Sequence, residues 1–275
     1  MHQTWNHFRR CWRIRPRQTT PRSYVCETLD HGSPDLARES GAQPYTLQWF
    51  LHIENHRLGR QGRWIPKLLE FAKHRGETLL GLGNGLGTDW LQYAKHGANV
   101  IVCSPSVKQL SLIRRNFELR HLTGKFVHAS SAGIPLETAS IDVVCVSSLL
   151  QEVPEPHAVV EEIYRVLKPG GKVLAVTPAK YDVDYWLRFC FPWQRIAKRD
   201  SDSRHMSGRF SRRELRRLFG RFSEHRIHKR HLRRRELPHV WRWAPLPVVE
   251  RLIGHVLVLK AFKPLSAAMS CTAAA

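Results

Sequence analysis

The apolar residues of the chain follow two different spacings on either side of residue 76. Between Tyr45 and Arg75 they recur at near-helical intervals, and Pro66 suits the first turn of a helix, so two helices are predicted there. From Glu77 onward, short apolar runs alternate with amphipathic stretches. The predicted strands are 78–82, 99–103, 125–129, 141–147 and 172–177, and the predicted helices are 87–96, 107–121 and 157–167.

This alternation predicts the fold class. Strands joined by helices of this length form crossover units in a parallel sheet that is covered on both faces. The continuously apolar runs 143–146 and 173–176 are typical of central strands. Ser211 and Glu214 have capping-box spacing for a helix over 211–219, and further strands are predicted at 226–231 and 256–262. We therefore expect an α/β protein with a seven-stranded, mostly parallel sheet and helices on both faces.

Composition narrows the possible classes of protein. The chain has 275 residues, of which 42% are hydrophobic and 24% charged, so it can bury a core and is not typical of a disordered or fibrous protein. It contains no apolar run long enough for a membrane span and no secretion signal, which favours a cytoplasmic protein. The six cysteines form no CxxC pair, which argues against zinc ribbons and redox motifs.

The formal net charge of +21 is concentrated in two segments. Residues 1–22 carry six arginines and no acid, and residues 204–235 carry thirteen basic residues against two glutamates. A basic segment on a nearly neutral body suggests an anionic partner for that segment. An arginine-rich, acid-free start is also found in organelle presequences, and that alternative stays open.

Four regions follow from these patterns. Residues 1–44 mix Arg, Pro, Ser and Thr and are expected to form a basic, disordered extension. Residues 45–75 hold the N-terminal helices, residues 76–265 form the α/β domain that includes the basic segment 204–235, and residues 266–275 form a flexible tail.

The most informative segment is the glycine-rich stretch that follows the first strand, Gly81 to Asp89 (GLGNGLGTD). Glycines let the backbone turn sharply and approach a ligand, and the N–H groups at the start of the next helix favour an anionic group. The dinucleotide fingerprint GxGxxG does not fit, because its last glycine would fall on Leu86 or Thr88. The spacing is GxGxG from Gly83, which can serve ligand binding or close helix packing.

Three further stretches accompany this loop in order: 140–144 (SIDVV), 149–156 (LLQEVPEP) and 162–172 (EIYRVLKPGGK). Together the four stretches resemble the class I S-adenosylmethionine-dependent methyltransferases, particularly the ubiquinone and menaquinone biosynthesis group, over residues 76–180. The resemblance implies a Rossmann-like methyltransferase fold, S-adenosyl-L-methionine as cofactor, and direct in-line methyl transfer to a small-molecule or lipid-like acceptor without a metal. The cofactor-binding residues that it implies are Gly81, Gly83, Asn84, Gly85, Gly87, Ser104, Ser130, Ser131 and Ser147.

The chain departs from the family pattern at three acidic positions. The family places carboxylates where this chain has Gly81, Ser104 and Ser130. Either the backbone loop and the serines still hold the cofactor, or the fold is retained by a non-catalytic protein with a degenerate cofactor site. Asp89 and Glu152 lie near the expected rim of the pocket, where they could compensate in part.

Candidate catalytic residues are assigned by position alone. In-line methyl transfer needs alignment more than acid–base chemistry, so a general base is optional. Glu152, His157 and Tyr181 are the candidates. Asp142 is expected to be structural, and Pro169 and Gly170 are expected to end the helix before the fifth strand.

The basic segment leaves the partner open. In its helix the four arginines Arg212, Arg213, Arg216 and Arg217 share one face and the apolar residues the other, which is typical of a solvated surface helix but also of phosphate binding. Trp241, Trp243 and the apolar stretch 245–258 follow, which suits an anionic membrane surface, peripheral attachment and a hydrophobic acceptor. An RNA methyltransferase is the alternative. Metal binding is not expected, because no HExxH motif occurs and several of the sixteen histidines lie among the arginines.

Overall fold

The computed structural model describes residues 42–59, 62–83, 85–190, 208–232, 234, 237 and 243–265. The predictions made for residues 1–41, for Asn84, for Trp241, for the unlisted part of the basic segment and for the tail 266–275 lie outside the described residues.

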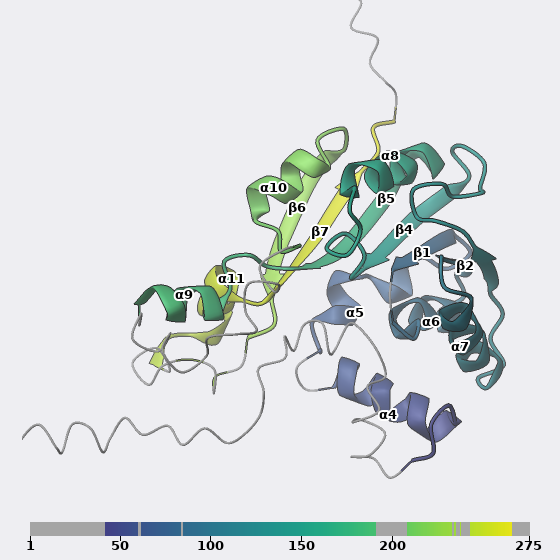
Figure 1. The fold of residues 1–275 in the computed structure, drawn as a ribbon, viewed down its shortest axis with the longest axis horizontal. Helices are drawn as coiled ribbons and strands as arrows, with labels where there is room; N and C mark the ends of the chain where they lie inside the picture. Colours follow the sequence, from purple (N-terminus) through teal and green to yellow (C-terminus); the bar gives the residue numbers. More distant parts are fainter. Residues whose placement is uncertain are drawn as a thin grey trace, which may run out of the picture.

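The core of the fold is a seven-stranded sheet with the order β3-β2-β1-β4-β5-β7-β6 (Figure 1). Strands β1 to β5 run parallel, and β7 runs antiparallel to both of its neighbours. This confirms the predicted fold class. The strands are β1 (Thr78–Gly83), β2 (Asn99–Ser104), β3 (Lys125–His128), β4 (Ile141–Ser147), β5 (Leu167–Pro178), β6 (Ser223–Arg230) and β7 (Val256–Phe262).

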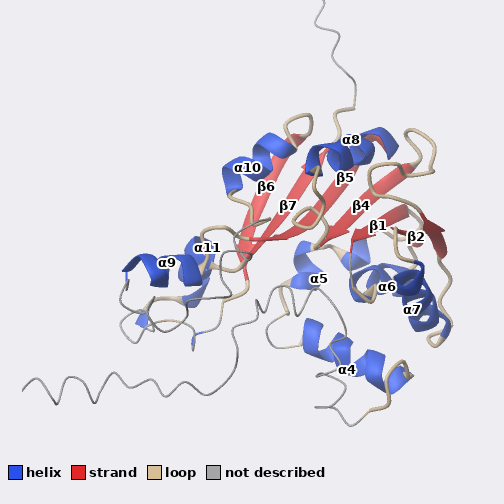
Figure 2. Ribbon diagram, viewed as in Figure 1, coloured by secondary structure: helices blue, strands red, loops and turns tan. Residues whose placement is uncertain are grey.

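Helices cover both faces of this sheet (Figure 2). One hydrophobic core joins α6 and α7 to one face, and the other core joins α8 and α10 to the opposite face. Residues that alternate along β4 divide between the cores, so Val144 and Val146 belong to one, Val143 and Cys145 to the other. The helices are α4 (Leu47–Leu58), α5 (Ile65–Leu68), α6 (Thr88–Lys95), α7 (Val107–Glu118), α8 (Pro156–Val166), α9 (Val183–Cys190), α10 (Arg212–Leu218) and α11 (Leu246–Ile253).

Two local signals are confirmed. Pro66 lies in the first turn of α5, and Ser211 and Glu214 form a reciprocal capping box at the start of α10. None of the helices in the described ranges has the length and apolar character needed to cross a bilayer.

The helix before β5 ends within one residue of its predicted end at 167, but β5 begins at Leu167 instead of residue 172. Helix α8 ends at Val166, and Leu167 already has extended backbone angles and pairs with Ile141 of β4. Leu167 is fully buried, so sheet pairing and burial end the helix before Pro169 is reached. Gly170, with φ of +77°, makes a turn within β5, where the register with β4 shifts.

A third, smaller core lies beyond the end of β5 and was not predicted. Helix α9 follows β5, helix α11 precedes β7, and Val183, Val249 and Ile253 pack together there. Both helices lie at the β6 and β7 side of the molecule (Figure 1).

Candidate functional site

The carboxyl ends of the four strands β1 to β4 form one continuous edge. In the register of the sheet, Gly83 pairs with Ser147, and Ser104 with His128. The turn after β3 begins two residues beyond His128, at Ser130. The structure therefore brings the predicted glycine loop and the predicted serines to the same edge, where open α/β sheets bind their ligands.

The glycines of the loop are required by close packing. Gly83, Gly85 and Gly87 have φ of +138°, +110° and +70°. A Cβ on Gly83 would lie 1.9 Å from the Ser147 carbonyl oxygen, and one on Gly87 would lie 2.7 Å from Cγ2 of Ile113. The loop therefore sits directly on β4 and α7, and larger residues at these positions would displace it.

Gly81 has a different position. It lies within β1, and a Cβ built on it would fall 2.6 Å from the indole ring of Trp90, which is almost fully buried. An acidic side chain at 81 would collide with this ring. The space next to Gly81 is therefore filled by Trp90, and the absence of the family carboxylate follows from this packing.

A glutamine that the sequence analysis missed holds the loop to β2. The Nε2 amide of Gln109, in the first turn of α7, donates to the carbonyl oxygens of Gly83 (3.2 Å) and Gly85 (3.0 Å). Its Oε1 accepts a hydrogen bond from the hydroxyl of Ser104 (2.7 Å), which in turn accepts from the Ser106 N–H (3.1 Å). Neutral amide and hydroxyl groups thus occupy the place where the family carries a carboxylate.

A second amide completes the attachment. Asn116, two turns further along α7, donates to the Leu86 carbonyl at 3.2 Å. Three loop carbonyls are therefore bonded by side chains of α7. In the described part of the chain, the backbone N–H groups of Gly85, Leu86 and Gly87 donate no hydrogen bond. A loop with satisfied acceptors and open donors suits a ligand group that accepts hydrogen bonds.

The remaining predicted serines have distinct environments. Ser104 is 1% exposed, and its hydroxyl is already bonded to Gln109. Ser130 is exposed, and its hydroxyl accepts from the Ala132 N–H (3.2 Å) in a tight turn. Ser131 and Ser147 are buried.

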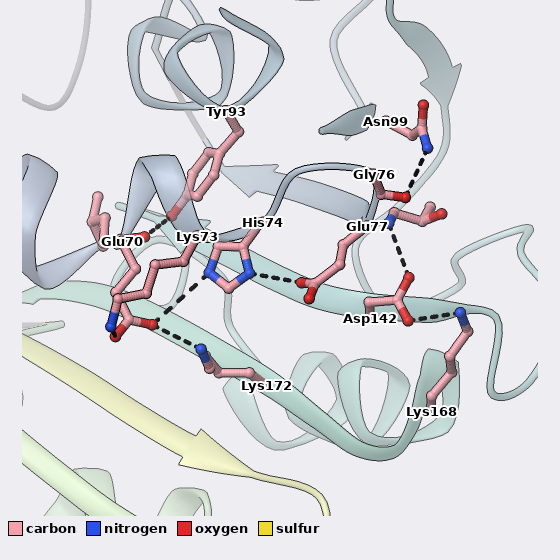
Figure 3. Close-up of polar contacts among 12 residues, drawn as sticks. Glu70, Lys73, His74, Gly76, Glu77, Tyr93, Asn99, Asp142, Lys168 and Lys172 are labelled. Atoms are coloured by element: carbon pink, nitrogen blue, oxygen red, sulfur yellow. Dashed lines mark hydrogen bonds and ion pairs between the residues drawn. The ribbon is translucent and has the colours of Figure 1, made fainter. Parts of the chain in front are cut away.

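The two acids considered outside the loop have structural roles. Asp89 is 4% exposed and pairs with the guanidinium of Arg57 on α4, with Nε to Oδ1 at 2.6 Å, so it does not lie on the pocket rim as expected. Asp142 accepts from the Thr78 N–H (2.9 Å) and pairs with Lys168 (2.7 Å) at the amino ends of β1 and β4 (Figure 3), which agrees with its expected structural role.

The three candidate bases are not assembled into one group. Glu152 is exposed in the turn after β4, and His157 is exposed at the start of α8. Tyr181 is 42% exposed and packs edge-to-face on Tyr185, with ring centroids 5.0 Å apart. All three lie on the side of the carboxyl ends of β4 and β5, and no described contact joins any two of them.

A buried ionic cluster lies beside them. Asp182, 2% exposed, accepts from Arg209 (2.5 Å), from the Tyr185 N–H (3.0 Å) and from Nδ1 of His255 (3.2 Å). Burial raises the pKa of Asp182, but the bonds to His255 and Arg209 outweigh it and leave the pKa below its usual value.

Asp182, Asp184 and His255 offer ligand atoms within 4.8 Å of one another. The charge of Asp182 is, however, already matched by Arg209, and the buried ammonium of Lys229 lies nearby. This arrangement fits an ionic cluster that fastens α9 to β7 better than a cation site, and the absence of a metal stays a prediction.

Several buried polar groups at the same edge lack partners. The hydroxyls of Ser148 and Thr177 and the side-chain amide of Gln151 are buried without a hydrogen bond in the described part of the chain. Ser148 and Gln151 follow β4, and Thr177 lies at the end of the adjacent strand β5. Ser148 has a positive φ of +52°. Clustered unpaired polar groups of this kind are expected where a ligand or water completes the bonding.

Comparison with known proteins shows which family this part of the chain resembles. Residues 79–175, from β1 into β5, match the family model of the methyltransferase domain. In this segment the chain is similar to that domain. A demethylmenaquinone methyltransferase from Clavibacter sepedonicus is 37% identical over 103 residues, which are 36% of this chain and 40% of that protein.

Two further similarities extend beyond this segment. A 2-methyl-6-phytyl-1,4-hydroquinone methyltransferase from Arabidopsis thaliana is 26% identical over 197 residues, covering 63% of this chain and 57% of that protein. A solved SAM-dependent methyltransferase from Aquifex aeolicus shares the fold with a TM-score of 0.53 at 15% identity, over 79% of this chain and 98% of that one. The chain spans about half or less of the first curated relatives, from 40% to 50% of their lengths.

Proposed function

We propose that the protein is an S-adenosylmethionine-dependent methyltransferase that acts on a small, lipid-like acceptor of the quinol class. The observation that carries this proposal is the loop from Gly83 to Gly87. In a methyltransferase domain, its carbonyls are fixed by Gln109 and Asn116 while its N–H groups remain open at the carboxyl edge of the sheet.

The residues at this edge fit the cofactor. The open N–H groups of the loop would bind an acceptor group such as its carboxylate, and Oε1 of Gln109 with the Ser104 hydroxyl would face the ribose hydroxyls. The bonds to the ribose are neutral here, so each contributes about 1 kcal/mol instead of the 1.5 to 3 kcal/mol of a charged acceptor. The bound cofactor would supply an activated methyl group.

The protein then has to align and shield the acceptor. The unpaired hydroxyls of Ser148 and Thr177 and the amide of Gln151 would orient acceptor oxygens beside the loop. Glu152, His157 and Tyr181 remain proposed proton acceptors, and His255, oriented by Asp182, joins them. A phenolic hydroxyl is acidic enough that a carboxylate or a neutral imidazole, such as Glu152, His157 or His255, could remove its proton as the methyl group is transferred.

The quinol class is supported by two relatives that are named as methyltransferases of demethylmenaquinone and of a phytyl hydroquinone. It is also supported by exposed apolar side chains at the same edge, since Tyr181 follows β5 and Leu252 precedes β7. An acceptor with a hydrocarbon tail would be bound favourably there.

A methyl-transfer assay tests this proposal. The purified protein is incubated with methyl-labelled S-adenosylmethionine and, separately, a reduced naphthoquinol and a reduced benzoquinol with an unmethylated ring position. Label in the quinol is expected, with a loss of at least tenfold in Gln109→Leu and none in the surface variant Glu77→Gln. Donor binding without transfer to either quinol would refute the acceptor class, and absence of donor binding would favour the degenerate site.

A further inference from the structure

The exposed apolar side chains of the molecule are concentrated at one end. Side chains that flank or belong to α9 and α11 account for five of the ten large exposed hydrophobic residues of the described chain. Trp243 is 92% exposed and Leu252 65%. We define the α9–α11 surface by these five residues: Tyr181, Trp186, Trp243, Val248 and Leu252.

The helices that carry these side chains pack on one small hydrophobic core. Val183 of α9 belongs to this core together with Val249 and Ile253 of α11. Helix α11 therefore buries one face and exposes Val248, Arg251 and Leu252, spaced three and four residues apart, on the other. An isolated exposed leucine needs no explanation, but a cluster of aliphatic and tryptophan side chains does.

A row of arginines continues from this surface. The guanidinium of Arg212, at the start of α10, donates to the Arg251 carbonyl at 2.8 Å and so joins α10 to α11. Beyond it, Arg213, Arg216 and Arg217 are exposed, and none forms an ion pair with another described residue. Helix α10 lies alongside β6, on the same side of the molecule as α9 and α11 (Figure 1).

The carboxylates of this end do not neutralise the row. Glu214 of α10 pairs with Lys180 at 2.7 Å and caps its own helix, and Glu250 of α11 lies 3.7 Å from Arg230. The surface thus presents aliphatic and indole groups next to uncompensated guanidinium groups, a combination that matches the interface of an anionic bilayer.

We propose that the α9–α11 surface and the arginines 213, 216 and 217 dock the protein on a membrane that contains anionic phospholipids. RNA would use the arginines and Trp243, but it offers no partner for the aliphatic side chains of Val248 and Leu252. The docked face lies at the carboxyl edge of the sheet, because α9 follows β5 and α11 precedes β7. A lipid-like acceptor would then enter from the bilayer, a consequence that rests on the proposed function, whereas the docking itself does not.

Vesicle co-sedimentation of the full chain tests the docking, with phosphatidylcholine vesicles prepared with and without phosphatidylglycerol. The apolar variant is Trp243→Ser with Val248→Ser, and the basic variant is Arg213→Gln, Arg216→Gln and Arg217→Gln. The matched control, Val107→Ser with Lys108→Gln and Lys125→Gln, changes an exposed valine and two exposed lysines on α7 and β3. Thermal unfolding establishes that every variant is folded.

We expect the wild type to bind only the anionic vesicles. The basic variant should bind about 100-fold more weakly, since each arginine near such a surface contributes roughly fivefold. The apolar variant should lose about tenfold or more. Any of three results would overturn the proposal. These are equal vesicle binding by wild type and both variants, an equal loss of vesicle binding in the control, and stronger binding to a single-stranded RNA through the same arginines.

A second readout separates docking from catalysis. Both variants should methylate a water-soluble, short-chain quinol at the wild-type rate and lose activity only on a long-chain quinol held in vesicles. If no quinol is methylated by the wild type, the proposed function fails while the vesicle result still decides the docking.

Discussion

The two ends of the parallel strands are stabilised in opposite ways. At the amino side, Glu70 lies between Lys73, Lys172 and Lys260, with carboxylate-to-ammonium distances of 3.1, 2.7 and 2.5 Å, and His74 bonds Glu77 at 2.7 Å (Figure 3). Burial raises the pKa of Glu70, but the hydrogen bonds from the lysines outweigh it and lower the pKa to about 2.

At the carboxyl edge the bonds are neutral and incomplete. Gln109, Asn116 and Ser104 fix the loop carbonyls, while loop N–H groups and the hydroxyls of Ser148 and Thr177 have no partner among the described residues. Charge compensation therefore marks the end that stabilises the fold, and unfilled hydrogen-bonding capacity marks the end at which we propose that the ligand binds.

The largest effect is expected at the amino side. Glu70→Gln leaves the partly buried ammonium groups of Lys172 and Lys260 without a carboxylate, which should lower the free energy of unfolding by about 3 kcal/mol. Chemical denaturation measures the change. Affinity for S-adenosylhomocysteine should be unchanged. The exposed neighbour Glu77→Gln is the control, and a comparable loss of stability there would contradict the special role of Glu70.

The next effect is expected at the carboxyl edge. Gln109→Leu removes both donors to the loop and the acceptor of Ser104, and should weaken S-adenosylhomocysteine binding by about 2 kcal/mol, roughly 30-fold. Calorimetric titration measures it. The matched control is Asn99→Leu, which removes an amide bonded to the Gly76 carbonyl at the other end. Weaker ligand binding in that control would mean that the loss is not specific to the loop.

Acidification should affect the amino side first. The pKa of Glu70 is depressed in the folded protein, so its stabilisation is complete above the unfolded pKa of 4.5 and is lost as the pH falls toward 2. Between pH 7 and pH 4 the loss should be about 1 kcal/mol. Denaturation across this range measures the difference in the free energy of unfolding between wild type and Glu70→Gln. This difference should shrink as the pH falls, and a constant difference would contradict the assignment of the low pKa to Glu70.

The smallest effect separates two of the predicted serines. Ser104→Ala removes one buried bond to Gln109 and should weaken S-adenosylhomocysteine binding by about 1 kcal/mol, roughly fivefold. Ser130→Ala, in an exposed turn, should change it less than twofold. The same titration checks both, and the reverse order would show that β3, not β2, holds the ligand.

Local signals in the sequence were sufficient for the sheet. Apolar runs and helical spacing predicted β4 and β7 at their observed bounds, and the glycine spacing correctly placed a turn between β1 and α6. Two amides were missed although they carried a signal: Gln109 and Asn116 stand seven residues apart on the helix face that also holds the buried Leu110, Ile113 and Phe117. Polar side chains on a buried face need partners, and here the partners are the loop carbonyls.

Other features depend on contacts that no local pattern contains. The pairing of Asp89 with Arg57 joins residues 32 positions apart, so the sequence alone placed Asp89 on the pocket rim. The start of β5 was misplaced because Leu167 already pairs with β4, before the turn that Pro169 and Gly170 signal. The ionic cluster around Asp182 was missed for the same reason, since His255 is 73 residues away.

The central claim is that the neutral carboxyl edge still binds the cofactor without the family carboxylates. Calorimetric titration of the purified wild-type protein with S-adenosylmethionine and with S-adenosylhomocysteine tests it most directly. We expect saturable one-to-one binding with a micromolar dissociation constant for both ligands, and weaker binding in Gln109→Leu. Absence of binding at millimolar ligand, with the protein folded, would contradict it and identify a methyltransferase fold whose cofactor site has been lost.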